Sequence, residues 1–128
     1  ERVDRPTLLR LRADIFLEQG REEAALAAYQ EAVRMRPRAP KTLNNLAWLL
    51  LTAQEKSLRD PHLAAQLDTE AVELEEKGYM LDTLAVALWM TGQADEAVSV
   101  EKKAARLDPE NQAYYQSQAE KFSAETEQ

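Results

Sequence analysis

The sequence predicts an all-α protein made of stacked helical hairpins, and three observations lead to this fold class. Only 3 glycines occur in 128 residues that are rich in Ala, Leu, Glu and Gln, a composition that favours helix. An offset of 34 residues relates Ala13 to Ala47, and one of 38 relates Ala47 to Ala85, so three units fit the chain. Alanine, glycine and proline also recur at one offset of 72, in the pairs Ala13/Ala85, Gly20/Gly92, Ala25/Ala97, Ala32/Ala104 and Pro37/Pro109.

Glycines and prolines mark the helix ends in the first and third units. We expect Gly20 and Gly92 to end the first helix of each unit, because helices commonly stop at a left-handed residue that glycine adopts without strain. Pro37 and Pro109 should end the second helices, since proline lacks the N–H that a helix interior needs. These boundaries predict helices over about 6–19, 22–36, 79–91 and 94–107.

The middle unit has a turn without glycine that is five residues longer than the turn of the first unit. Pro40 should open the first helix of this unit, at a position where a missing N–H costs nothing. Asp60 should cap the second helix, which Pro61 opens. Helices are therefore expected over about 40–53 and 61–76. The long turn is either a tolerated surface insertion or a lip that contacts a ligand.

A seventh helix is expected over about 109–124, and it has no partner helix in the chain. Tyr115, Ala119 and Phe122 recur at the spacing of one helical face. Asp108 would serve as the N-cap of this helix. We expect the apolar face to pack on the preceding helix and to close the end of the stack.

The residue types of the units resemble the tetratricopeptide repeat (TPR), a 34-residue helix–turn–helix with small residues at fixed positions and a proline near its end. The resemblance covers residues 6–109. In the first unit it is carried by Leu9, Ala13, Phe16, Gly20, Ala25, Tyr29, Ala32 and Pro37, and in the third by Leu81, Leu84, Ala85, Leu88, Gly92, Ala97, Ala104 and Pro109. Two departures stand out, because Asp68 and Glu101 occupy positions where the family prefers a large aromatic residue.

The resemblance implies one domain over residues 1–128, a right-handed superhelix of three TPR units with a capping helix at about 109–124. The units would span about 6–39, 40–77 and 78–111. The lengthened middle turn looks like that of a bacterial TPR subgroup, which favours the bacterial cytoplasm or periplasm. Because the chain starts with Glu1 and no capping helix covers its first helix, we expect it to belong to a longer protein with further repeats upstream.

In the TPR family the first helices of successive units line a concave groove that holds an extended peptide or a partner helix. The resemblance assigns this role to Arg10, Asp14, Leu17, Lys41, Asn44, Trp48, Leu51, Tyr79, Asp82, Val86, Trp89 and Met90. Some TPR domains grip a C-terminal carboxylate with lysines, arginines and asparagines. Here Asp14, Trp48, Asp82 and Val86 stand at those positions, so we expect no carboxylate clamp.

Trp48 and Trp89 could serve as aromatic anchors in this groove or as fillers between neighbouring helices. The two interpretations are evenly balanced for Trp48. The groove is favoured for Trp89, because this residue shares a helical face with Val86 and Asp82. On that basis Trp89→Ala is expected to leave the fold nearly intact.

Few side chains offer catalytic or metal chemistry. The absence of cysteine excludes disulfides, thiolate zinc sites and a cysteine nucleophile. His62 is the only histidine, and we expect it to be exposed in the first turn of a helix. The acidic run from Asp68 to Glu76 lacks the spacing of a calcium loop and is interpreted as a solvated helix surface. We therefore predict a protein without catalytic activity, metal or cofactor.

The net charge of −7 is spread unevenly along the chain. Residues 1–41 carry nine Lys/Arg and seven Asp/Glu, and the remainder carries seven and sixteen. An acidic surface repels nucleic acid, so we expect no nucleic-acid binding. The basic cluster Arg34, Arg36, Arg38 and Lys41 is interpreted as cations that complement a helix dipole. The longest uncharged run, 42–54, is too short for a membrane span, and we expect no membrane insertion.

Two functions fit this architecture. The first is a non-catalytic protein–protein interaction module that binds a peptide or helix of a partner protein in its concave groove. The alternative is a structural or self-assembly module that stacks with further repeats or forms homo-oligomers.

Overall fold

The computed structural model describes residues 2–126, with side chains up to residue 124, and every regular element in this range is helical. Three antiparallel hairpins are followed by a single helix that packs on the third hairpin. The hairpins are α1 (Arg5–Glu18) with α2 (Glu22–Met35), α3 (Pro40–Thr52) with α4 (Pro61–Leu74), and α5 (Gly78–Met90) with α6 (Ala94–Leu107). The last helix is α7 (Gln112–Thr126), and the short 3-10 helices η1 (Lys56–Leu58) and η2 (Pro109–Asn111) lie in turns. The all-α class and the seven α-helices of this range are as predicted.

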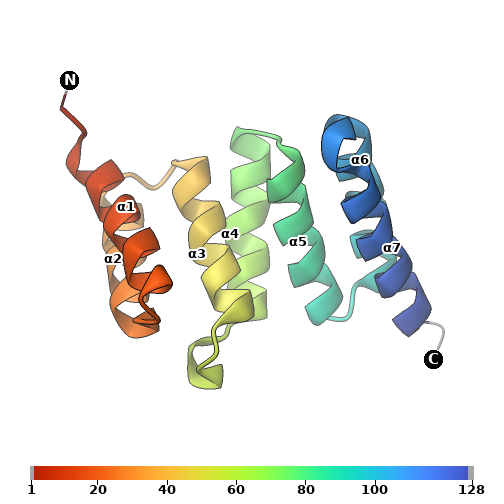
Figure 1. The fold of residues 1–128 in the computed structure, drawn as a ribbon, viewed down its shortest axis with the longest axis horizontal. Coiled ribbons are helices and arrows are strands. Elements are labelled where there is room, and N and C mark those ends of the chain that lie inside the picture. Colours follow the sequence, from red (N-terminus) through yellow and green to blue (C-terminus); the bar gives the residue numbers. More distant parts are fainter. Residues whose placement is uncertain (1, 127–128) are drawn as a thin grey trace.

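The hairpins stand side by side in one row, with α1 and α2 at one end and α7 at the other (Figure 1). Neighbouring hairpins touch where α2 meets α3 and where α4 meets α5. The first helices of the second and third hairpins, α3 and α5, also contact each other directly. They therefore form one layer of the stack, which α1 and α7 extend at its two ends.

The helix ends follow the sequence signals at most places. Gly20 and Gly92 have φ of 74° and 87°, so both adopt the left-handed conformation expected of them. Pro40 is the first residue of α3, and the carboxylate of Asp60 caps α4 by accepting from the N–H of Leu63 at 3.1 Å.

The start of α7 differs from the prediction. The helix begins at Gln112, after the turn of η2, and the side chain of Asp108 caps no backbone N–H. Its carboxylate accepts instead from the side-chain amide of Asn111 at 2.9 Å and the hydroxyl of Tyr115 at 2.8 Å. Asp108 thus joins the turn to α7 through side chains.

Small residues at the repeat positions let the helices pack closely. Ala13, Ala25, Ala47 and Ala64 are fully buried, as a close helix crossing requires. The aromatic position of the first unit, Tyr29, is also buried.

The corresponding positions of the other two units hold Asp68 and Glu101, and both side chains are 0 % exposed. The interpretation of Asp68 as part of a solvated surface was therefore wrong. This position of the repeat faces the interior between α4, α5 and α6, so the side chain there is buried whether it is polar or not.

The capping face of α7 is buried as expected. Tyr115 packs with Leu81 and Ala105, and Phe122 packs with Leu84 and Ala97. The face thus reaches both helices of the third hairpin, since these contacts come from α5 as well as α6.

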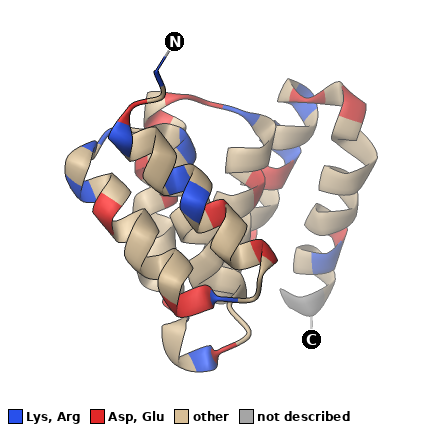
Figure 2. Cartoon of the chain, turned by 60° about the vertical axis from the view of Figure 1, so that its left-hand side comes forward, with Lys and Arg blue, Asp and Glu red and all other residues tan. Residues whose placement is uncertain are grey.

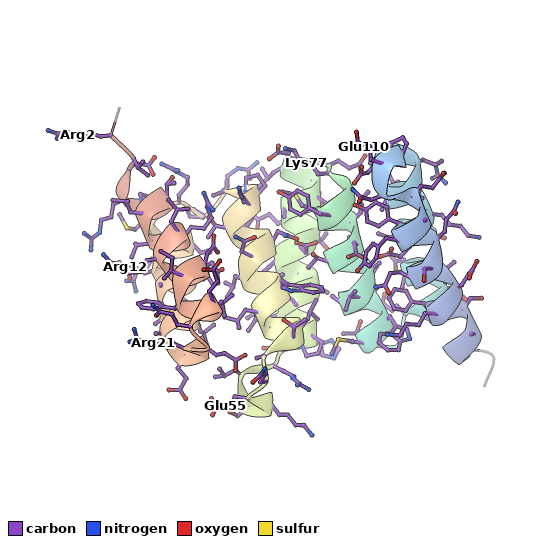
Figure 3. All side chains as sticks on the ribbon, viewed as in Figure 1. Arg2, Arg12, Arg21, Glu55, Lys77 and Glu110 are labelled. Atoms are coloured by element: carbon purple, nitrogen blue, oxygen red, sulfur yellow. The ribbon has the colours of Figure 1, made fainter. Side chains whose placement is uncertain are left out.

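The long turn between α3 and α4 is anchored to the first hairpin. It protrudes beyond the helix ends, with Glu55 at its tip (Figure 3). The carboxylate of Glu22 accepts from the backbone N–H groups of Gln54 and Glu55 at 2.8 and 3.0 Å. Within the turn, Arg59 donates to the carbonyl of Ala53 at 2.6 Å. These contacts tie the start of the turn to α2 and link its two ends.

Charged side chains lie mostly on the outside of the stack. Lys and Arg residues are frequent on the end formed by α1 and α2 (Figure 2). There Arg36 pairs with Asp4, whose carboxylate also caps α1 through the N–H of Thr7. His62 is exposed in the first turn of α4, as predicted. Among the described residues, no helix has the length and apolar character needed to cross a bilayer.

Candidate binding cleft

A cleft of about 400 Å³ opens across the layer formed by α1, α3, α5 and α7. Aromatic and polar side chains from all four helices line it, with one residue from α2. The lining residues are Asp14, Leu17, Tyr29, Asn44, Asn45, Trp48, Tyr79, Asp82, Thr83 and Tyr114. Six of them were expected at the groove from the sequence, namely Asp14, Leu17, Asn44, Trp48, Tyr79 and Asp82.

Four lining residues were missed. Tyr29 lies on α2, the second helix of the first hairpin, and its side chain lines the cleft from there. Asn45 and Thr83 each follow an expected residue by one position. Tyr114 lies on α7, where no groove residue was expected. This helix takes the place that the first helix of a fourth unit would occupy.

Several expected groove residues lie elsewhere. Leu51 is only 4 % exposed and belongs to the hydrophobic core, and Val86 packs half-buried against the same core. Lys41 and Met90 are exposed but do not line the cleft. Arg10 lies beside the cleft and pairs with Asp14.

Trp89 does not line the cleft, although the sequence favoured the groove for it. Its ring stacks on Phe122 of α7 with centroids 5.0 Å apart, and Lys121 lies over it at 5.2 Å (ammonium to ring centroid). The indole is therefore packed beneath the capping helix. The sequence position alone did not reveal this, because the partner ring comes from a helix outside the repeat pattern.

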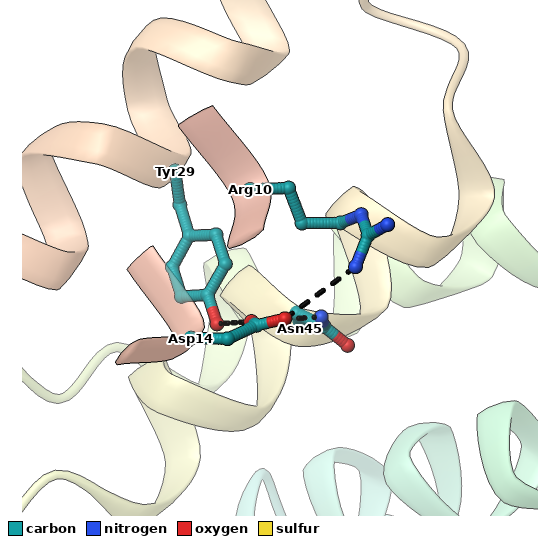
Figure 4. Close-up of polar contacts among 4 residues, drawn as sticks. All are labelled: Arg10, Asp14, Tyr29 and Asn45. Carbon is teal, nitrogen blue, oxygen red and sulfur yellow. Dashed lines mark hydrogen bonds and ion pairs between the residues drawn. The ribbon is translucent and has the colours of Figure 1, made fainter. Parts of the chain in front are cut away.

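Asp14 is the polar centre of the N-terminal half of the cleft (Figure 4). One carboxylate oxygen accepts from the hydroxyl of Tyr29 and from the amide of Asn45, the latter at 3.2 Å. The other oxygen faces the guanidinium of Arg10 at 3.4 Å. Burial and the bond to Asp14 hold the pKa of Tyr29 far above its usual range, so this hydroxyl remains a donor.

Asp82 plays the equivalent part in the C-terminal half. It is 8 % exposed, and one of its oxygens accepts from the hydroxyl of Tyr114 at 3.2 Å. Partial burial, together with the Asp82 carboxylate, raises the pKa of Tyr114 to about 12. The second oxygen of Asp82 is buried away from the cleft, where the carboxyl group of Glu101 is its neighbour, and the side-chain oxygen of Asn44 is buried as well.

Two further carboxyl groups lie behind Asp82, in the interior. Burial raises the pKa of Glu101 to about 10, and the neighbouring Asp82 adds to this shift. Burial likewise raises the pKa of Asp68 to about 8. At neutral pH both groups are therefore held mainly in the uncharged form. The described residues contain no group of three or more acidic or histidine side chains placed to hold a metal ion.

Three aromatic rings give the cleft its exposed surface. Trp48 is 40 % exposed, Tyr79 43 % and Tyr114 50 %. The structure thus assigns Trp48 to the cleft rather than to the core. Rings of this kind offer large contact area at low entropic cost.

Comparison with known proteins agrees with this architecture. The sequence profile of the TPR repeat matches residues 13–52. A solved structure, the first TPR of Spaghetti (RPAP3) bound to the HSP90 peptide SRMEEVD, superimposes with a TM-score of 0.84 over 98% of both chains at 19% identity. The chain therefore contains a TPR repeat over residues 13–52 and has the fold of a TPR domain.

Two cyanobacterial proteins are similar to this TPR chain in sequence. The photosystem I assembly protein Ycf3 of Synechococcus sp. (strain WH7803) is 34% identical over 87 residues, which cover 61% of this chain and 50% of the relative. The same protein of Synechococcus sp. (strain CC9311) matches to the same extent. The TPR chain thus spans about half the length of the curated relatives that it matches.

Proposed function

We propose that this TPR chain is a non-catalytic protein-interaction module that binds a segment of another protein in the cleft between α1, α3, α5 and α7. The observation that carries the proposal is the row of half-exposed rings, Trp48, Tyr79 and Tyr114, above buried polar groups in one continuous cleft. Exposed aromatic residues in a concave site are common anchors for a bound chain. The division into units at about 6–39, 40–77 and 78–111 is part of this proposal.

The comparisons support an interaction role. The similar solved structure holds a peptide, and the similar curated proteins are named for assembly. TPR repeats are typically interaction modules without catalytic activity. The peptide of that solved structure is acidic, and the cleft of this chain lacks the basic side chains that such a ligand would need.

Selection of peptide ligands from a random displayed library tests the proposal. Affinities of the selected peptides are then compared for the wild type, Trp48→Ala and Leu63→Ala. Leu63 is a matched control, because its exposed fraction of 38 % is close to that of Trp48 and it stands on α4, outside the cleft. We expect Trp48→Ala to weaken binding about tenfold or more and Leu63→Ala to leave it unchanged. Equal affinity for all three proteins would contradict the proposal.

A second candidate function, self-assembly or stacking with further repeats, is favoured by one feature of α1. Leu8, Leu11 and Ile15 are 50 %, 40 % and 52 % exposed and share one face of the helix. Such an apolar stripe suits contact with another repeat or a second copy. Light scattering of the wild type and of Leu11→Glu tests this candidate. A concentration-independent monomer for both proteins would count against self-assembly.

A further inference from the structure

The charged side chains that line the cleft are both acidic. Asp14 reaches it from α1 and Asp82 from α5, and no lysine or arginine is among the described residues that line it. Arg10 lies next to Asp14 and offsets the charge of that carboxylate. Asp82, at the other half, has no basic partner in the described part of the chain. The C-terminal half of the cleft is therefore electrostatically negative.

Two hydroxyl groups at this end use their protons within the protein. The hydroxyl of Tyr114 already donates to Asp82, and that of Thr83 donates to the carbonyl of Tyr79 at 3.1 Å. Because both protons are used, each of these hydroxyl groups offers a ligand only its acceptor lone pairs. A ligand that donates hydrogen bonds can use these lone pairs beside the carboxylate of Asp82.

Aromatic rings surround the same place. Trp48, Tyr79 and Tyr114 line the cleft from α3, α5 and α7 and each keeps two fifths to one half of its surface exposed. The face of an aromatic ring attracts a cation, and the alkyl stem of a long basic side chain packs against it. The cleft thus combines a carboxylate, hydroxyl oxygens that can accept hydrogen bonds, and aromatic walls.

We propose that the C-terminal half of the cleft, formed by Asn44, Trp48, Tyr79, Asp82 and Tyr114, receives an arginine or lysine side chain of the bound partner. This inference rests on the proposed function and specifies the chemistry of its ligand. The partner segment is basic at this position. This partner segment differs in charge from the acidic peptide of the similar solved structure, because an acidic side chain at this position would face the carboxylate of Asp82.

Synthetic peptides of one length and one neutral background sequence test the inference, with arginine, citrulline or glutamate as the central residue. Citrulline keeps the shape of arginine without its charge. Binding is followed by two-dimensional NMR of the isotope-labelled protein at millimolar peptide. We expect the arginine peptide to shift the backbone amides of Trp48, Asp82 and Thr83, and to bind about tenfold or more tightly than the citrulline peptide. Binding of the arginine peptide should weaken as salt is raised. The same comparison is made between a lysine peptide and an acetyl-lysine peptide, in which the positive charge is absent.

Two variants test whether the carboxylate of Asp82 and the ring of Trp48 form the binding site. Asp82→Asn keeps an acceptor for Tyr114 and should abolish the preference for arginine over citrulline. Trp48→Ala removes an exposed ring and should weaken both peptides, whereas the control Leu63→Ala should weaken neither. Peptides that shift the same amides without any preference for the positive charge overturn this inference and leave the proposed function standing. A protein whose cleft amides respond to no peptide contradicts both.

Discussion

Replacing Asp68 with asparagine should stabilise the protein at neutral pH, because the carboxyl is buried where ionisation is unfavourable. Its side chain is 0 % exposed, and the nearby carboxylate of Asp82 disfavours a second negative charge. Burial raises its pKa from 3.8 to about 8. The folded state therefore holds a proton that the unfolded state has lost at any pH between these two values.

The sign of the pH dependence follows from this difference. Stability contributed by the protonated group is fully present below pH 3.8, and it falls as pH rises toward 8. The slope for one proton is about 1.4 kcal/mol per pH unit, so the loss at pH 7 is on the order of 4 kcal/mol. Asparagine is uncharged at every pH and resembles the protonated acid in shape. Asp68→Asn should thus gain stability that grows with pH over this range.

Urea melts at pH 4, 5, 6 and 7 measure the effect. We expect the difference between Asp68→Asn and the wild type to be small near pH 4 and to grow to about 2–4 kcal/mol at pH 7. Glu73→Gln is the control, because Glu73 is exposed on the same helix and its replacement should change little at any pH. A variant with the same pH dependence as the wild type would refute the reasoning.

Three further substitutions test other parts of the structure. Gly78→Ala should lose about 1–3 kcal/mol in urea melts, since an added Cβ would lie 2.8 Å from the Cβ of Asp108; unchanged stability would show that the turn can move. Trp89→Ala should lose about 2 kcal/mol or more by removing the stack on Phe122, and a near-neutral effect would place the ring outside the core. Glu22→Gln should speed hydrogen exchange at Gln54 and Glu55, because the carboxylate accepts from their backbone N–H groups. These hydrogen bonds lower the pKa of Glu22, so in the wild type their support is present above the usual pKa of a glutamate and is lost as pH falls through the lowered value. Exchange equal to that of the wild type would contradict the anchoring.

The helices were predictable from sequence because their signals are local. The left-handed Gly20 and Gly92 and the cap at Asp60 each depend on a few neighbouring residues. Asp108 failed as a predicted cap for α7 because its carboxylate is bound by Asn111 and Tyr115, a competition that no local rule describes.

The site was predictable only in part, since it depends on contacts between helices distant in sequence. Trp48 and Trp89 both had groove-facing positions in the repeat pattern, yet α7 covers Trp89 and leaves Trp48 half-exposed. The buried acids carried a usable signal, because Asp68 and Glu101 stand in the register of the fully buried Tyr29. Weighing that register above the polarity of the residues would have placed both in the interior.

The central claim is that the layer of α1, α3, α5 and α7 forms the binding surface. Its most direct test is a map of amide shifts across the whole labelled protein on titration with a library-selected peptide. The claim predicts that the largest changes gather at the cleft residues of these four helices, around Asn45, Trp48, Thr83 and Tyr114. Changes concentrated on the outer helices α2, α4 and α6 would contradict it.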